Sequence, residues 1–121
     1  MQFEITGTPG PFFLCHCSRC RKGTGSAHAA NIFVPGGTLE WRAGRSFVRG
    51  FKLPDTRHAR AFCTNCGAPV PNQQGDVVVL PAGALDTPMP VPATAHICGE
   101  SRADWDAGLA NIATYPGLPT G

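Results

Sequence analysis

Apolar and polar side chains alternate over short stretches of this chain, and turn-forming residues separate those stretches. A period of two is typical of β-strands that bury one face. The strongest signal is the Val-Val-Val run inside residues 76–80, which indicates a buried strand. Taken together, the stretches predict strands at residues 3–6, 27–34, 38–42, 46–52, 57–62, 76–80 and 93–97.

Turn signals support this division of the chain. Glycine and proline fill residues 7–11 and 35–37, where predicted strands end. One helix is expected at residues 101–109, with Ser101 as N-cap and Asp104 in its first turn. Regularly spaced strands with so little helix predict a mainly β fold, either a sheet or a sandwich.

Composition indicates one loop-rich domain. A chain of 121 residues suits a single domain, here residues 1–121. Its 15 glycines and 12 prolines favour loops, and its 42% hydrophobic fraction still supports a folded core. A domain of this kind gains stability from a bound metal.

Charge and hydropathy argue against two classes of partner. The net charge is +2, and the basic residues form no arginine-rich run with interleaved aromatics, so we predict no nucleic-acid partner. No stretch reaches the length of a membrane span, and the first residues show no signal peptide. We therefore expect a cytoplasmic protein with reduced cysteines rather than a secreted disulfide scaffold.

Five of the six cysteines fall into two clusters, at residues 15–20 and 63–66. Ligand sulfurs around tetrahedral zinc lie about 3.8 Å apart, so they come from tightly folded backbone such as C-x-C and C-x-x-C. The first cluster offers three thiolates, which leaves one position open, as in catalytic zinc sites. These three residues are Cys15, Cys17 and Cys20.

A single structural site explains the same spacing equally well. It would take two thiolates from each cluster and leave Cys15 spare, with Cys17, Cys20, Cys63 and Cys66 as ligands. Cations beside the first cluster favour a catalytic site over a structural one, because they lower thiol pKa values and can hold the carboxylates of a ligand. They are Arg19, Arg21 and Lys22, and a flexible turn, residues 23–26, follows them.

The histidines are weaker candidates than the cysteines. His16 stands between two ligands and is expected on the opposite face of the strand, behind the site or at the surface. His96 and Cys98 share one face of a predicted strand, but we expect a packed or exposed histidine and a small buried cysteine. Trp105, like Trp41, is expected to pack in the core or at its rim.

The motifs resemble those of the glutathione-dependent formaldehyde-activating enzymes, a family related to centromere protein V. The resemblance spans residues 3–106 and rests on Cys-His-Cys-Ser-Arg-Cys-Arg-Lys-Gly-Thr-Gly-Ser and on Phe-Cys-Thr-Asn-Cys-Gly. It implies a zinc-binding Mss4-like fold, named after an exchange factor for Rab GTPases. It also implies a catalytic zinc on Cys15, Cys17 and Cys20, and half of a structural zinc site on Cys63 and Cys66.

One part of the family pattern is missing. In the family, the structural zinc takes two more ligands from an N-terminal Gly-x-Cys-x-Cys-Gly segment, and this chain begins at Met1 without it. Cys63 and Cys66 are then metal-free, recruit other ligands, or share one zinc with the first cluster. We expect one or two Zn²⁺ per chain.

The resemblance implies a zinc-dependent carbon–sulfur lyase that joins formaldehyde and glutathione into S-(hydroxymethyl)glutathione. A zinc held by three thiolates would accept a small-molecule thiol such as glutathione. The alternative is a zinc-stabilised binding module without catalysis, and a third reading is a thiol redox protein using Cys17 and Cys20. The sequence leaves homo-oligomerisation open.

Overall fold

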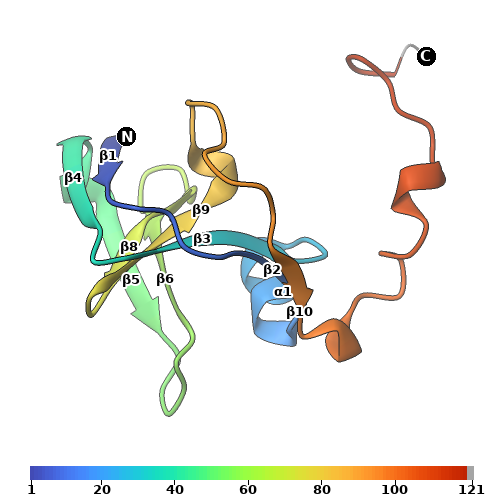
Figure 1. The fold of residues 1–121 in the computed structure, drawn as a ribbon, viewed down its shortest axis with the longest axis horizontal. Coiled ribbons are helices and arrows are strands. Elements are labelled where there is room, and N and C mark those ends of the chain that lie inside the picture. The colour runs from blue at the N-terminus through green and yellow to red at the C-terminus, as the bar shows by residue number, and fades with distance from the viewer. Residues whose placement is uncertain (120–121) are drawn as a thin grey trace.

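The computed structural model describes residues 1–119 and is mainly β (Figure 1). The described residues contain one α-helix, α1 (Ser18–Thr24), and four 3₁₀ turns: η1 (Arg45–Phe47), η2 (Ala82–Ala84), η3 (Gly99–Ser101) and η4 (Leu109–Asn111). The strands are β1 (Gln2–Thr6), β2 (Phe12–Cys15), β3 (Ala29–Pro35), β4 (Thr38–Ala43), β5 (Val48–Lys52), β6 (Ala59–Cys63), β7 (Pro69–Val70), β8 (Asn72–Gln74), β9 (Val77–Pro81) and β10 (Ala95–Ile97).

The strands form three sheets. The largest has the order β10-β2-β3-β9-β8, and all its neighbours are antiparallel except β10, which runs parallel to β2. The pair β1-β4 and the three-stranded sheet β5-β6-β7 complete the fold. Because β2 is hydrogen-bonded on both sides, its last residue, Cys15, is fixed between Ala29 of β3 and Ile97 of β10.

The main core lies on one face of the large sheet. Alternating residues of β3 and β9 meet there: Ile32 pairs with Leu80, and Val34 pairs with Val78, which is fully buried. Phe12 of β2 joins them, and side chains of β1 and β4 cover this cluster. A second, smaller cluster lies in the three-stranded sheet and consists of Ala61, Cys63 and Val70, with Trp41 and Val48 packed against it.

Each of the predicted strands has a counterpart, namely β1, β3, β4, β5, β6, β9 and β10. Three strands were not predicted: β2, β7 and β8. The residues of β2 are an apolar run without alternation, and β7 has only two residues, one of them a proline, so neither carries a period-two signal.

The helix predicted at residues 101–109 is wrong. Ser101 ends the turn η3 instead of capping a helix, and Gly108 adopts a left-handed φ of 75° that interrupts helical geometry. Trp105 was expected in the core or at its rim, but 56% of it is exposed. Because this segment packs no apolar face against the body, tertiary contacts do not stabilise a helix there.

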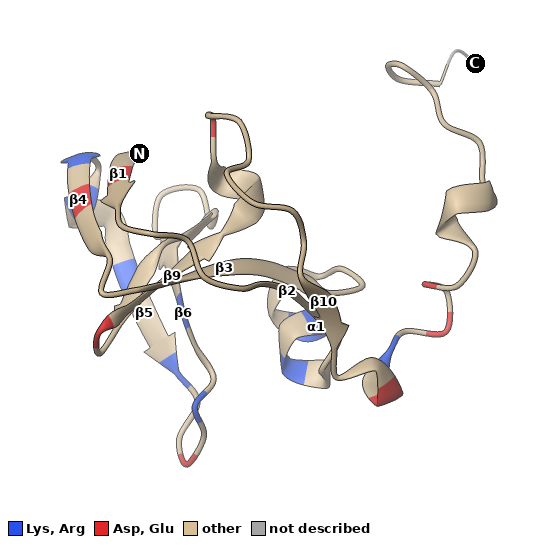
Figure 2. Ribbon diagram, viewed as in Figure 1, with Lys and Arg blue, Asp and Glu red and all other residues tan. Residues whose placement is uncertain are grey.

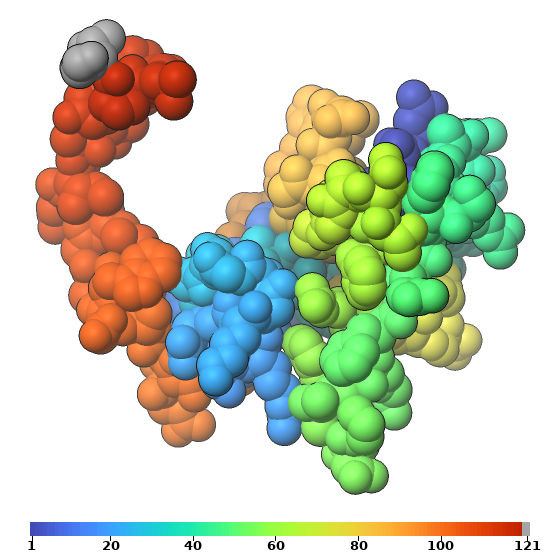
Figure 3. Space-filling model, turned by 180° about the vertical axis from the view of Figure 1, so that it is seen from behind, coloured from blue at the N-terminus to red at the C-terminus, as the bar shows by residue number. Residues whose placement is uncertain are grey.

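Beyond Asp106 the chain leaves the body as an extended arm. Every residue from 107 to 119 is exposed, and the arm stands apart from the rest of the molecule (Figure 3). Within residues 1–119, no helix combines the length and the apolar character needed to cross a membrane.

Candidate metal centre

The fold brings Cys15, Cys17 and Cys20 together. One sulfur from each residue lies within 4.8 Å of the others, and all three residues are half-buried. Cys15 ends β2, Cys17 follows in the connecting turn, and Cys20 lies in α1. In the described part of the chain, no other three His, Cys, Asp or Glu residues approach one another this closely. Three soft ligands at this spacing could hold a metal ion.

The short helix α1 positions the third thiol. Cys17 is its N-cap, and the Cys17 Sγ accepts a hydrogen bond from the Cys20 backbone N–H at 3.4 Å. At the other end Gly25 has a left-handed φ of 64° and donates its N–H to the Arg21 carbonyl at 2.8 Å. Residues 23–26 were expected to form a turn, and the first two of them, Gly23 and Thr24, end the helix instead. A glycine directly after basic residues was the available signal for a helix C-terminus.

The three thiols differ in acidity. Burial raises the pKa of Cys15 and of Cys20, and for Cys20 the neighbouring sulfurs raise it further. Burial acts on Cys17 in the same direction, but hydrogen bonds from the Cys20 backbone and from both neighbouring thiols outweigh it and lower the pKa of Cys17. Cys17 is therefore the first thiol to ionise. Three thiolates this close would repel one another without a cation among them, and a metal ion held by the cluster could supply that charge.

The predicted cations border this cluster in different ways. Arg19 and Lys22 are exposed on α1, whereas Arg21 is half-buried and its Nε donates to the Ser101 carbonyl at 3.1 Å. Arg21 therefore ties α1 to the segment that follows β10. Arg60 of β6, which no sequence pattern predicted here, also reaches α1: its Nη1 donates to the Gly23 carbonyl at 3.1 Å.

A band of positive charge results along one edge of the site. Basic residues occur on α1 and on the β5–β6 hairpin (Figure 2). Burial lowers the pKa of His58, and the charges of Arg19 and Arg60 lower it further. Arg19 and Arg60 are therefore both close enough to His58 to influence its charge. Arg60 lies about 40 positions from the cluster in sequence, and the fold brings it to α1, where it bonds to Gly23.

Three histidines lie behind the thiols. The register places Cys15 and Ile97 on one face of the sheet and Leu14 and His96 on the other. His16 is fully buried, with its Nε2 at 2.8 Å from Nδ1 of His96. The ring of His28 lies 5.1 Å from that of His16, between centroids. The sequence offered no signal that these rings meet.

Asp106 lies next to this histidine cluster. Its carboxylate lies 3.8 Å from His16 Nδ1 and forms an ion pair with Arg102 at 2.7 Å. Burial lowers the pKa of His16, and the charge of Arg102 lowers it further, against the opposing effect of Asp106. Burial therefore favours the neutral form of His16. Cys98, expected to be buried, is exposed, because the chain turns there with a φ of 55° into η3.

The second cysteine pair lies apart from the first cluster. Cys63 ends β6 and is buried, while Cys66 is exposed in the following turn. Gly67, with a φ of 77°, closes that turn by donating its N–H to the Cys63 carbonyl at 2.7 Å. The Cys66 backbone N–H lowers the pKa of Cys63. Within residues 1–119, the four-cysteine site that would combine both clusters does not form. Cys63 and Cys66 by themselves offer two ligands.

Comparison with known proteins agrees with the motif spacing. The model of the family described as "Glutathione-dependent formaldehyde-activating enzyme" matches residues 1–101. A protein of Halomonas elongata that carries the same family name is 31% identical over 112 residues, which cover 84% of this chain and 69% of that protein.

Proposed function

Because the chain belongs to the glutathione-dependent formaldehyde-activating enzyme family, we propose that it is a zinc-dependent carbon–sulfur lyase. Its reaction would join glutathione and formaldehyde into S-(hydroxymethyl)glutathione and reverse that step. The observation that carries this proposal is the group of three half-buried thiols, to which the described residues add no fourth protein ligand. A binding module without catalysis would use four protein ligands, because structural zinc sites are closed.

Cys15, Cys17 and Cys20 would hold the zinc. When bound, it supplies a soft coordination position for a substrate sulfur and lowers the pKa of that thiol. In the reaction the glutathione sulfur forms a bond to the formaldehyde carbon, the C=O π pair moves onto oxygen, and that oxygen takes up a proton. Cleavage of the same C–S bond returns both substrates.

The positive edge beside α1 fits the charge of the thiol substrate. Glutathione has two carboxylates, which are ionised at neutral pH and pair well with guanidinium and ammonium groups. Arg19 and Lys22 are exposed and face no carboxylate partner among the described ion pairs. Arg60 borders them through its bond to Gly23. Arg21 is partly engaged by Ser101, so we assign it chiefly to positioning α1.

The catalytic proposal is tested by exchange NMR, since the uncatalysed reaction also reaches equilibrium. Zinc-loaded protein should accelerate exchange between hydrated formaldehyde and S-(hydroxymethyl)glutathione. Cys17→Ser should lose this acceleration together with the metal at the first cluster, and Cys98→Ser, an exposed thiol outside the cluster, should keep both. Full acceleration by metal-free Cys17→Ser protein would refute the proposal.

A second experiment tests substrate binding. The double variant Arg19→Ala, Lys22→Ala should raise KM for glutathione by about tenfold, with kcat changed little, because the cations bind substrate away from the reacting atoms. Arg45→Ala, an exposed cation between β4 and β5, is the matched control. Equal KM values for the double variant and the wild type would assign glutathione binding elsewhere.

A further inference from the structure

The C-terminal arm, residues 107–119, has apolar side chains that its own chain does not cover. Its large apolar residues recur at every third position: Leu109 is 42% exposed, Ile112 64%, Tyr115 60% and Leu118 91%. The arm contains no charged residue. In the described structure no hydrogen bond joins it to the body, and its single backbone bond runs from Asn111 to Gly108.

This pattern is suited to docking. In the 3₁₀ turn η4, side chains three apart lie on one side, and the rest of the arm keeps the three-residue spacing of apolar residues in sequence. Such a row of large apolar groups is unfavourable in water and marks an interaction surface. The start of the arm is anchored, because the Asp106 carboxylate lies 3.8 Å from His16 Nδ1 and the Ser101 carbonyl accepts from Arg21.

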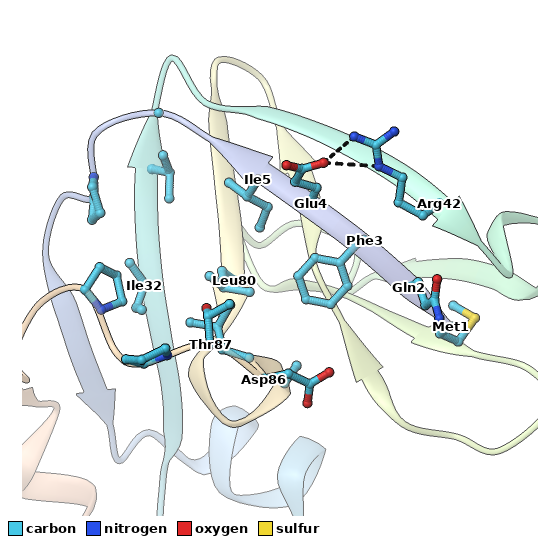
Figure 4. A pocket seen from close by; sticks show the side chains of 17 residues that line it. Met1, Gln2, Phe3, Glu4, Ile5, Ile32, Arg42, Leu80, Asp86 and Thr87 are labelled. Carbon is cyan, nitrogen blue, oxygen red and sulfur yellow. Dashed lines mark hydrogen bonds and ion pairs between the residues drawn. The ribbon is translucent and has the colours of Figure 1, made fainter.

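A cleft of about 750 Å³ lies between β1 and the segment that follows β9 (Figure 4). Phe3 and Leu85 line its sides, and the core residues Ile32 and Leu80 line its floor. Glu4 and Arg42 at its edge neutralise each other through an ion pair. Asp86 also lines the cleft and forms none of the described ion pairs, so it is the apolar floor that suits an apolar segment.

The arm and the cleft lie at different ends of the molecule. The arm follows β10 at one end of the long axis, whereas β1 and β4 are at the other (Figure 1). We propose that the arm of one copy docks into the cleft of a second copy, and that the second arm returns the contact. A reciprocal exchange uses each surface once and closes into a two-fold dimer.

Two observations favour a second copy as the partner. One chain carries one arm with a row of apolar side chains and one cleft with an apolar floor, so the two surfaces occur in equal number. In a reciprocal exchange each copy contributes both its 13 arm residues and its 17 cleft residues, which together reach the about 20–30 residues that a stable interface uses on each side. The arm lies beyond residue 101, where the family match ends, so the proposal does not depend on the proposed activity.

Sedimentation equilibrium on the full-length, zinc-loaded protein tests the exchange. The wild type should be a dimer at micromolar concentration. Ile112→Ser with Tyr115→Ser in the arm should raise the dimer Kd at least about tenfold. The matched control is Phe51→Ser, which removes an apolar side chain that is 46% exposed on β5, outside both surfaces, and it should leave the Kd within about twofold of the wild type.

Changes in the cleft should act like changes in the arm. Ala84→Trp fills the cleft, and Thr87→Arg places a charge at its edge, where a surface residue is replaced and folding is unaffected. Both should raise the Kd as the arm variant does. An arm variant mixed with a cleft variant should form a heterodimer through the one intact arm–cleft contact, although neither variant dimerises well alone.

Three outcomes would overturn the exchange. The first is a wild type that stays monomeric at every concentration, with its arm folded back onto its own cleft or free. The second is a dimer whose Kd is indifferent to the arm variant. The third is a Kd that Thr87→Arg leaves unchanged, which would assign the arm to another surface.

Discussion

Removal of one thiol from the first cluster should abolish the metal-dependent part of the protein's stability. Cys20→Ser takes away the ligand that α1 carries and leaves two sulfurs, too few to hold zinc tightly. To isolate this site, wild-type and variant clusters are compared in a chain that also carries Cys66→Ser, so that the second pair contributes no metal site. Cys98→Ser in the same background is the control.

The size of the effect follows from mass action. Free zinc at 100 times its Kd stabilises a folded protein by about 2.7 kcal/mol. A chain of 121 residues unfolds with an entropy of about 0.25 kcal/mol per kelvin, so zinc should raise Tm by about 10 °C. Calorimetry in zinc buffers and in chelator measures this shift. The Cys98→Ser control should show it and Cys20→Ser should not; equal shifts in both would refute a metal centre at Cys20.

Three further changes test the packing of the fold and the surroundings of the site. Gly37→Ala should lower the free energy of unfolding in urea by about 2 kcal/mol or more, because its Cβ would lie 2.7 Å from Val34 Cγ1. The matched control is Gly36→Ala, where a positive φ is strained but no atom is crowded, and it should cost about 1 kcal/mol. His16→Ala should cost about 2–4 kcal/mol by the same measurement and leave the three thiols titratable by a thiol reagent. Asp106→Ala should cost about 1–3 kcal/mol and speed proteolysis of the arm, since it removes a mostly buried carboxylate that pairs with Arg102 and lies beside His16.

Local sequence patterns predicted the strands that alternate and the thiols that lie close along the chain. The β3 and β9 strands follow directly from apolar periodicity, because their side chains form the core. Cys15, Cys17 and Cys20 lie within six residues, so almost any compact turn brings them together. Such short spacing alone keeps the three sulfurs close, so this prediction needed no tertiary information.

Tertiary contacts supplied what those patterns lacked. His16 meets His96 across 80 positions of sequence, and Arg60 meets Gly23 across 37. The first contact depends on the pairing of β10 with β2, and the second on how β6 lies against α1, which no local pattern predicts. The helix predicted after residue 101 failed for the converse reason: local capping residues were present, but no packed face stabilised them.

The alternation Cys15-His16-Cys17 explains how one short stretch serves both faces of the large sheet. The thiols take the face toward α1, and His16 takes the face toward His96 and Asp106. Asp106 immediately precedes the arm and lies beside His16. The short stretch that carries the thiols therefore also carries a side chain that contacts the start of the docking segment.

The two proposals nevertheless fail separately. Cys17→Ser removes a ligand contained within one copy and leaves the arm and the cleft intact, whereas Ile112→Ser with Tyr115→Ser leaves every thiol in place. An active monomer would thus refute the exchange alone, and an inactive dimer the chemistry alone.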